Sequence, residues 1–246
     1  MGAGTGSRFG VYTQIKPKGF ICVGGVPMIV KSIENILRVG IEKIIIGTGY
    51  QSSYYEELTK IYPQIVCCKS DKYAETNSMY TLHCCSELIA NDDFLLLESD
   101  LIYERKSLSL LINSEYPDVM LITPPAKQQD GYYICTDNEG ILSECTTDMD
   151  KKDKCKGELV GIHKLSNDTY QKMHDWYGNI WQQQPKLGYE YVLLEMARQG
   201  VKIHVLKEHI FWYEIDDESD LQYAGKNIIH YISQNEKLET NLGKSQ

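Results

Sequence analysis

The stretch Glu42–Thr48 has the sequence EKIIIGT and runs into Gly49, so three consecutive isoleucines end in Gly-Thr-Gly. A β-branched apolar run of this length that stops at glycine is typical of a strand buried on both faces of a parallel sheet. Just ahead of it, Pro27–Val39 places apolar residues at helical spacing, with Pro27 at its start and Gly40 after its end. A helix followed by a buried strand predicts an α/β fold.

The same alternation of short apolar runs and helical patterns continues through the first half of the chain. Short strands are expected at Ile65–Cys68, Phe94–Leu97 and Val119–Thr123. A helix is expected over Ser78–Ile89, with Asn77 as its N-cap. Strands separated by helices in this way predict a parallel sheet covered by helices.

The pattern changes after two consecutive prolines at 124–125. Tyr132–Thr136 and Ile141–Glu144, separated by the turn sequence DNEG, predict an antiparallel hairpin. We therefore expect residues 124–165 to form an insertion. The elements expected from there on are the strand Glu158–Leu165, helices over Ser166–Tyr177 and Tyr189–Arg198, strands near Val201–Leu206 and Trp212–Ile215, and a helix near Asp217–Ser233.

Together these elements predict a doubly wound, mostly parallel α/β sheet of Rossmann-like architecture with a small antiparallel insertion. We expect one domain over residues 1–234 and a polar tail over residues 235–246. A glycine-rich loop in such a fold follows a first strand, but here the loop begins at Gly2. The first strand is therefore expected to be missing from this sequence.

Composition excludes several classes of partner. The 246 residues are 42% hydrophobic and 24% charged, which is typical of a soluble globular protein. No apolar run is long enough for a membrane span, and no signal peptide is recognisable. The net charge of −9 argues against nucleic acid as a partner. We expect no membrane and no nucleic acid among the partners of this chain.

The cysteines and histidines show no pattern of a transition-metal site. No Cys-x-x-Cys pair occurs, so we expect buried free thiols and a reducing, cytoplasmic location. Any metal should then be a hard cation held by carboxylates. The eight cysteines are Cys22, Cys67, Cys68, Cys84, Cys85, Cys135, Cys145 and Cys155.

The most informative motif is GAGTGSR at residues 2–8, followed by Pro17-Lys18. Closely spaced glycines allow successive backbone N–H groups to approach phosphate oxygens. Arg8 adds a permanently charged fork, and Lys18 could neutralise charge on a phosphorus under attack. The alternative is an ordinary glycine-rich turn, since the motif matches neither a Walker A loop nor a dinucleotide-binding fingerprint.

Two carboxylates follow apolar strands, where ligands gather in open α/β sheets. Asp100 ends the run FLLLESD, and Asp216 lies in the run EIDD. Both positions suit a Mg²⁺ ligand, although either residue could instead cap a helix or sit in a solvated loop. Thr76-Asn77-Ser78 could likewise cap a helix, contact a ligand, or do both, and Tyr50 could lie against a base.

These motifs together resemble the sugar-nucleotide-type nucleotidyltransferases. The resemblance rests on AGTGSR with the later Pro-Lys, IIIGTGY, DKYAETNSMYTL, LLLESD, GELVGIHKLS and YEID, and it spans nearly the whole chain. Within that superfamily the chain is similar to the branch of phosphocholine and 2-aminoethylphosphonate cytidylyltransferases. GELVGIHKLS is more similar to the aminoethylphosphonate enzymes.

The resemblance implies a role for each matching residue. The triphosphate loop would be Ala3, Gly4, Thr5, Gly6, Ser7 and Arg8, and the catalytic groups would be Lys18 and Arg8. The remaining nucleotide-binding residues would be Tyr50, Thr76, Asn77, Ser78 and Ser99, and the two magnesium ligands would be Asp100 and Asp216.

The implied reaction transfers CMP from CTP to 2-aminoethylphosphonate, with Mg²⁺ as cofactor and pyrophosphate as the second product. The acceptor is already an anion near neutral pH, so no general base is required. Its ammonium carries three donors and should meet carboxylates, for which we expect Glu158 and Glu190, with Tyr189 walling the pocket. A quaternary ammonium would need an aromatic cage instead. Candidate aromatics are Tyr132, Tyr133, Trp176 and Trp181, unless they only pack.

Three alternatives remain at this point. The acceptor could be phosphocholine or a sugar phosphate, or the chain could be a nucleotide-binding regulatory protein without catalysis. The presence of Lys18, Asp100 and Asp216 together favours an enzyme.

Overall fold

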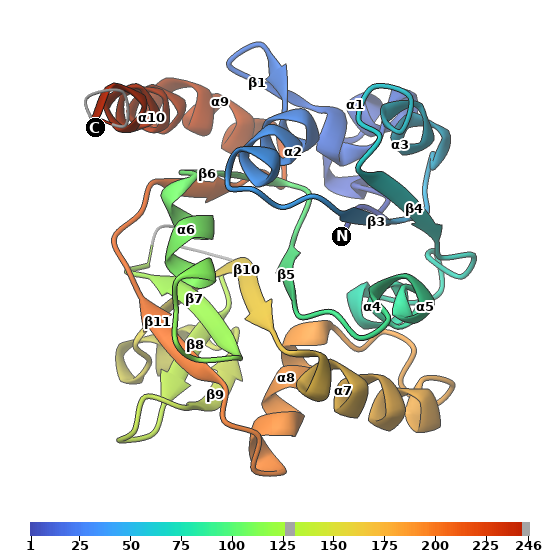
Figure 1. Cartoon of the computed structure of the whole chain (residues 1–246), viewed down its shortest axis with the longest axis vertical. Coiled ribbons are helices and arrows are strands. Elements are labelled where there is room, and N and C mark those ends of the chain that lie inside the picture. Colours follow the sequence, from blue (N-terminus) through green and yellow to red (C-terminus); the bar gives the residue numbers. More distant parts are fainter. Residues whose placement is uncertain (126–130, 243–246) are drawn as a thin grey trace.

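A computed structural model describes residues 1–125 and 131–242 of the chain (Figure 1). The α-helices are α1 (Val11–Ile15), α2 (Met28–Arg38), α3 (Ser53–Leu58), α4 (Ser78–Cys84), α5 (Ser86–Ile89), α6 (Lys106–Ile112), α7 (Asn167–Ile180), α8 (Tyr189–Arg198), α9 (Glu218–Asn227) and α10 (Ile229–Leu242). The strands are β1 (Cys22–Val23), β2 (Val26–Pro27), β3 (Ile44–Thr48), β4 (Ile65–Lys69), β5 (Phe94–Leu97), β6 (Leu101–Tyr103), β7 (Val119–Thr123), β8 (Tyr133–Thr136), β9 (Leu142–Thr146), β10 (Gly157–Leu165), β11 (His204–Lys207) and β12 (Trp212–Glu214).

The α/β fold class is confirmed, and the strands form mixed rather than uniformly parallel ladders. β3 pairs with β4 in parallel, and β7 pairs with β11 in parallel. β10 is antiparallel to β5, β7 and β8, and β8–β9 is the expected antiparallel hairpin. In the sheet β8 lies between β9 and β10 and is antiparallel to both.

Two layers of helices cover the strands, as a doubly wound fold requires. Along β7, Met120 and Ile122 pack into one apolar cluster, whereas Val119 and Leu121 pack into another. The first cluster contains side chains of α4, α5, α7 and α8, and the second contains side chains of α2 and α6. Alternate residues of one strand therefore face opposite helical layers, which is the two-residue repeat of a buried strand.

The ends of several elements differ from the sequence prediction. The helix expected over Ser78–Ile89 is interrupted at Cys85, and the last helix is interrupted at Ile228. Helix α10 continues to Leu242, so much of the expected polar tail is helical, and residues 243–246 lie outside the described part. No helix among the described residues is long and apolar enough to cross a bilayer.

The expectation that all cysteines are buried free thiols is wrong. Cys135 and Cys155 form a disulfide, and Cys22 is exposed. The backbone N–H of Lys156 donates to the carbonyl of Ile134 at 2.7 Å, which holds the segment ahead of β10 beside β8. That pairing, which spacing along the chain does not reveal, brings the two sulfurs together.

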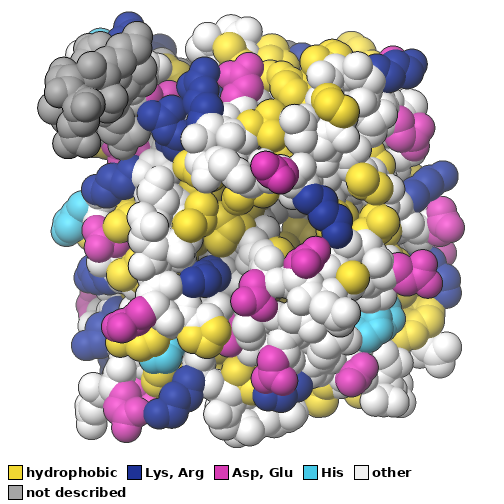
Figure 2. Space-filling view, viewed as in Figure 1, with side chains coloured by type: hydrophobic (Ala, Val, Ile, Leu, Met, Phe, Trp, Pro, Cys, Tyr) yellow, Lys and Arg dark blue, Asp and Glu magenta, His cyan; other side chains and the backbone are white. Residues whose placement is uncertain are grey.

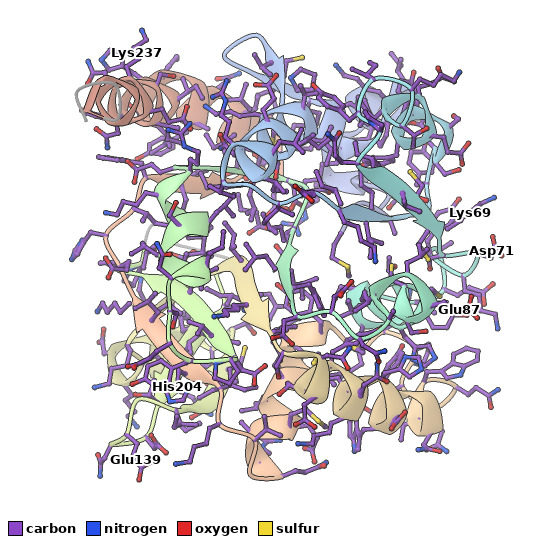
Figure 3. All side chains as sticks on the ribbon, in the orientation of Figure 1. Lys69, Asp71, Glu87, Glu139, His204 and Lys237 are labelled. Atoms are coloured by element: carbon purple, nitrogen blue, oxygen red, sulfur yellow. A yellow bond between two sulfur atoms is a disulfide. The ribbon has the colours of Figure 1, made fainter. Side chains whose placement is uncertain are left out.

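The insertion and the final helix lie far apart. Glu139, in the turn between β8 and β9, and Lys237, in α10, lie toward opposite ends of the long axis of the molecule (Figure 3). The candidate site described below draws on segments between these two extremes.

Candidate functional site

Lys18 brings together the two carboxylates that the sequence singles out. Its Nζ donates to Asp100 Oδ2 at 2.6 Å and to Asp216 Oδ1 at 2.7 Å. Lys18 lies in the 3₁₀ turn after Pro17, Asp100 lies between β5 and β6, and Asp216 follows β12. Three segments far apart in sequence therefore converge on one buried ammonium.

The surroundings of Lys18 keep its charge fixed. Burial by itself would lower the pKa of the Lys18 ammonium, but the charges and hydrogen bonds of Asp100 and Asp216 outweigh it, and the pKa is raised. Only 13% of the side chain is exposed. Gly6 covers the stem: its φ is +60°, and an added Cβ would lie 2.8 Å from Thr13 Cγ2 and 3.1 Å from Lys18 Cβ. A side chain at position 6 would therefore be both strained and crowded.

Asp216 is not the cap of the following helix. The side chain of Asp217 accepts from the backbone N–H of Asp220 and caps α9. Asp216 points the other way, toward Lys18 and toward Arg8, whose Nη1 lies 3.3 Å from Asp216 Oδ2. The structure therefore excludes Asp216 as the N-cap of α9.

A pocket of about 190 Å³ opens beside this cluster. Its lining includes many of the expected nucleotide-binding and catalytic residues, namely Ala3, Gly4, Lys18, Thr76, Asn77, Ser78, Ser99 and Asp100. The sequence analysis missed Tyr73 and Tyr55, which also line it. Asn77 does cap α4, as expected, by accepting from the N–H of Ser78.

Five of the expected nucleotide-binding and catalytic residues lie outside this pocket lining, namely Thr5, Gly6, Ser7, Arg8 and Tyr50. The expected metal ligand Asp216 and the expected acceptor residues also lie outside it. Thr5 and Arg8 are exposed along the loop that continues from the pocket, and Ser7 opens a 3₁₀ turn. The N–H of Tyr50 donates to the carbonyl of Ala3 at 3.3 Å, and its ring centre lies 6.4 Å from that of Tyr73. Tyr50 is thus held next to the start of the glycine loop.

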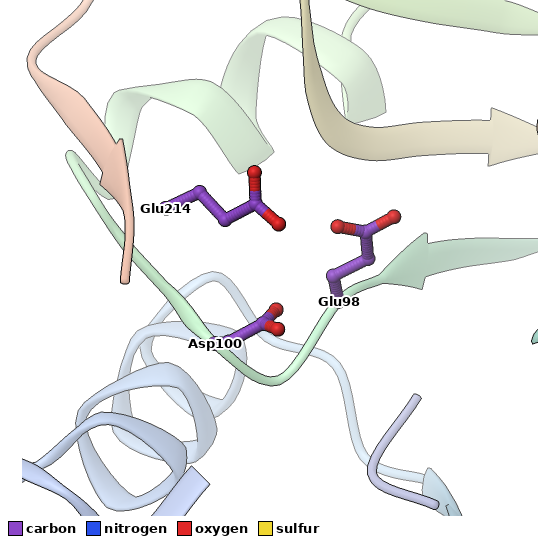
Figure 4. Close-up of side chains that lie close together, drawn as sticks. All are labelled: Glu98, Asp100 and Glu214. Carbon is purple, nitrogen blue, oxygen red and sulfur yellow. The ribbon is translucent and has the colours of Figure 1, made fainter. Parts of the chain in front are cut away.

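Glu98 and Glu214 join Asp100 in a group that the sequence analysis did not identify (Figure 4). Oxygen atoms of the three carboxylates all lie within 4.8 Å of one another. Burial, and then the charges of Asp100 and Glu214, raise the pKa of Glu98 well above its usual range. Oxygen donors gathered in this way suit a hard divalent cation.

A buried hydrogen-bond chain orients Glu98. The hydroxyl of Tyr189 donates to Glu98 Oε1 at 2.6 Å, and His163 Nε2 lies 3.1 Å from the same hydroxyl. Because the hydroxyl donates to Glu98, it accepts from the Nε2–H of His163. Burial lowers the pKa of His163 to about 3, so the imidazole is neutral. Tyr189 therefore contacts Glu98, a carboxylate that the sequence analysis did not assign to the site.

The two other residues expected to bind the acceptor, Glu158 and Glu190, are both buried. Glu158, on β10, is buried, and its charge contributes to the raised pKa of Tyr213. Glu190, on α8, is buried beside Tyr132, and its charge contributes to the raised pKa values of Glu98 and Tyr189. Glu158 therefore acts electrostatically on Tyr213, and Glu190 acts on Glu98 and Tyr189.

Known proteins share both sequence and fold with this chain. The 2-aminoethylphosphonate cytidylyltransferase of Lancefieldella rimae is 26% identical over 170 residues, which cover 69% of this chain and 61% of that protein. The choline-phosphate cytidylyltransferase of Streptococcus pneumoniae is 34% identical over 91 residues, 37% of this chain and 39% of that protein. The chain thus spans less than two thirds of the length of either relative.

A solved structure shows that the fold is shared. The CTP:phosphocholine cytidylyltransferase from Streptococcus pneumoniae superposes with a TM-score of 0.75 at 20% identity, covering 92% of this chain and 95% of that one.

The family model of the MobA-like NTP transferase domain matches residues 1–164. The matched part carries the glycine loop, Lys18 and Asp100. With two thirds of its length matched, this chain belongs to the family of MobA-like NTP transferase domains.

Proposed function

We propose that this chain transfers CMP from CTP to 2-aminoethylphosphonate, yielding CMP-2-aminoethylphosphonate and pyrophosphate. The observation that carries the proposal is the convergence of Lys18, Asp100 and Asp216 beside a pocket lined by the glycine loop. Relatives named for cytidylyl transfer to small phosphonates and to choline phosphate support the same reaction class.

The nucleotide would lie in the pocket between the glycine loop and α4. Backbone N–H groups of residues 3–8 would receive the phosphates, because little side-chain bulk obstructs their approach. The base would lie toward Tyr50, which is held beside Ala3. Thr76, Asn77, Ser78 and Ser99 line the same pocket as Ala3 and would contact the nucleotide.

Lys18 and Arg8 would stabilise the charge that develops during transfer. An acceptor phosphonate oxygen attacks the α-phosphorus of CTP, the new P–O–P bond forms, and the bond to the β-phosphate breaks to release pyrophosphate. Lys18 is held rigidly by two carboxylates, and Arg8 lies at the exposed edge of the same cluster. Fixed positive charge of this kind stabilises a phosphoryl transition state without prior reorganisation.

Asp100 and Asp216 would hold Mg²⁺. Their fit to a cation is supported by the arrangement in hand, because both already converge on one, the ammonium of Lys18. When bound, the metal would neutralise phosphate charge. Glu98 and Glu214 supply further oxygen donors next to Asp100.

The acceptor would enter from the side of the insertion, residues 124–165, within a domain of residues 1–234. Its primary ammonium would be met by Glu158 and Glu190, with Tyr189 as a wall and Glu98 as an additional acceptor. A region with this many buried carboxylates favours a cation that donates hydrogen bonds over a quaternary ammonium, which cannot donate.

The test is pyrophosphate release measured with each of the four ribonucleoside triphosphates and a panel of acceptors, with and without Mg²⁺. The expected result is Mg²⁺-dependent release with CTP, and a higher kcat/KM for 2-aminoethylphosphonate than for phosphocholine or a sugar phosphate. A higher kcat/KM for phosphocholine would overturn the acceptor. The absence of release with every pair would favour a nucleotide-binding regulatory protein.

Two variants test the acceptor site separately from the reaction. Glu158→Gln and Glu190→Gln should each raise the KM for 2-aminoethylphosphonate while leaving the KM for CTP near that of the wild type. An unchanged acceptor KM in both variants would remove these two residues from the site.

A further inference from the structure

One wall of the nucleotide pocket is formed by a buried tyrosine. Tyr55, on α3, lines this pocket together with Lys18, Ser99 and Asp100. Only 1% of the residue is exposed. Its ring packs inside the protein, edge to face against Phe20, with the two ring centres 5.2 Å apart. The ring is therefore held firmly while Tyr55 still reaches the pocket.

The hydroxyl of Tyr55 joins two of the segments that carry the site. It hydrogen-bonds with the side chain of Ser99 and with the backbone of Gly19. Gly19 directly follows Lys18, and Ser99 directly precedes Asp100. The two charged residues are 82 positions apart in the chain. One hydroxyl therefore ties the turn of the lysine to the segment of its carboxylate partner.

The start of the glycine loop reaches the same end of the ring. A Cβ added at Gly2 would lie 2.9 Å from Cζ of Tyr55. A Cβ added at Gly19 would lie 3.1 Å from the hydroxyl oxygen and 3.3 Å from the carbonyl oxygen of Ser99. Both backbones approach the ring closely because glycine has no side chain to intervene. Tyr55 thus contacts the glycine loop, the turn of Lys18 and the segment ahead of Asp100.

The charges of the site depend on accurate placement. Figure 2 shows lysine, arginine, aspartate and glutamate side chains scattered over the surface of one face. The side chains of Lys18, Asp100 and Asp216 are instead mostly buried. Coulomb interactions are stronger where water is excluded, and they vary with separation. A misplacement of about 1 Å in such a site can cost about 100-fold in rate.

We propose that Tyr55 is a positioning residue for nucleotidyl transfer, an inference that rests on the proposed function. Its hydroxyl holds the turn of Lys18 against the segment of Asp100, so that the ammonium meets the charge that develops on the phosphate. Tyr55 acts through these neighbours and not on the reacting atoms.

The chemistry of the phenol suits a fixed, neutral contact. Burial raises the pKa of Tyr55 above its usual range, and this outweighs the hydrogen bonds with Ser99 and Gly19, which lower the pKa. The phenol therefore keeps its proton at neutral pH and brings no further charge to the site.

A second buried tyrosine provides the matched control. Tyr103 belongs to the same apolar cluster as Tyr55, and its hydroxyl lies 2.7 Å from Ser32 Oγ. It is not among the residues that line the nucleotide pocket in the described part of the chain. Tyr103→Phe therefore removes a buried hydroxyl of the same kind away from the site.

The first measurement is steady-state kinetics of wild type, Tyr55→Phe and Tyr103→Phe with CTP and 2-aminoethylphosphonate. Tyr55→Phe should lower kcat about 10-fold or more and keep the KM for CTP within about twofold, because the ring and the pocket wall remain. Tyr103→Phe should keep the kcat of the wild type. Both variants should lose a similar few degrees of melting temperature, about 3 °C.

The second measurement needs no turnover. The N–H groups of Phe20 and Ile21 donate to the carbonyls of Pro17 and Lys18 at 2.9 and 3.0 Å and close the turn that carries the lysine. Amide hydrogen exchange at these two positions should be about 10-fold faster in Tyr55→Phe than in Tyr103→Phe.

The two measurements separate this proposal from the proposed function. An inactive wild type with faster exchange in Tyr55→Phe would refute the transfer reaction and retain the anchoring of the Lys18 turn. A wild-type kcat in Tyr55→Phe, or an equal loss of kcat in both variants, would overturn the positioning role. Loss of kcat with unchanged exchange would also overturn it, because Tyr55 would then act directly on the nucleotide.

Discussion

At the scale of single residues, the candidate site is organised around the ammonium group of Lys18. It lies within 2.7 Å of both Asp100 and Asp216, and each of these carboxylates comes from a different part of the chain. Removing it would leave two mostly buried carboxylates facing each other without their shared cation.

Lys18→Ala should therefore lower kcat about 100-fold or more, since charge stabilisation is lost in the transition state. It should also destabilise the fold by about 1–3 kcal/mol, because buried charged groups lose a partner. Steady-state kinetics and urea unfolding measure the two effects. Lys18→Arg keeps the charge and should recover most of the stability. Turnover like that of the wild type in folded Lys18→Ala would remove the catalytic role.

Asp216 and Asp217 offer a matched pair of neighbouring residues. Asp216→Asn should raise the Mg²⁺ requirement and lower turnover, because an amide is a weaker ligand for a hard cation. Asp217→Asn should be nearly silent, since asparagine is itself a good cap for α9. Asp217→Ala should cost about 1 kcal/mol of stability and leave the Mg²⁺ dependence unchanged. The measurement is enzyme activity as a function of Mg²⁺ concentration for each variant. Identical Mg²⁺ dependence in the Asp216→Asn protein and the wild type would contradict the role of Asp216 as a metal ligand.

At the scale of elements, the disulfide Cys135–Cys155 ties β8 to the segment that leads into β10. Thiol titration of the denatured, unreduced protein should therefore find six free cysteines. Reduction should lower the free energy of unfolding by about 3 kcal/mol, since the bond closes a loop of moderate length. The double variant Cys135→Ser/Cys155→Ser should match the reduced protein, and Cys145→Ser should keep the response to reductant. Eight reactive thiols would contradict the bond.

At the scale of the whole molecule, stability should fall in mild acid because of His163. Its pKa is about 3 in the folded protein, against an ordinary value of 6.5. Between these values the unfolded chain binds a proton that the folded chain does not, so the free energy of unfolding falls as the pH is lowered through this window. Above pH 6.5 His163 is neutral in both the folded and the unfolded chain, so it does not affect how the free energy of unfolding changes with pH.

His163→Gln should flatten the pH profile of the free energy of unfolding by up to about 1.4 kcal/mol per pH unit. Urea unfolding of both proteins between pH 7.5 and 4.5, in steps of about 0.5 pH unit, would measure this difference in slope. The exposed His230 provides the control variant, His230→Gln, which should keep the slope of the wild type. A slope unchanged in His163→Gln would contradict the role of this histidine.

Local pattern in the sequence was enough to predict most of the helices and strands. Strand β5 and helix α8 have the expected bounds, because an apolar run between polar residues and a helical repeat after glycine are short-range signals. The glycine loop, Lys18 and the two aspartates were recognisable for the same reason, since residue type and spacing carry the chemistry.

Only the tertiary structure decided which distant residues meet. Lys18 is 82 residues from Asp100 and 198 from Asp216, and nothing along the chain specifies that one ammonium joins them. The grouping of Glu98 with Glu214, the antiparallel course of β10 and the disulfide likewise depend on which strands lie side by side. The physical reason is range: backbone propensity and the burial repeat act over a few residues, whereas contacts across the sheet follow from the topology of the whole fold.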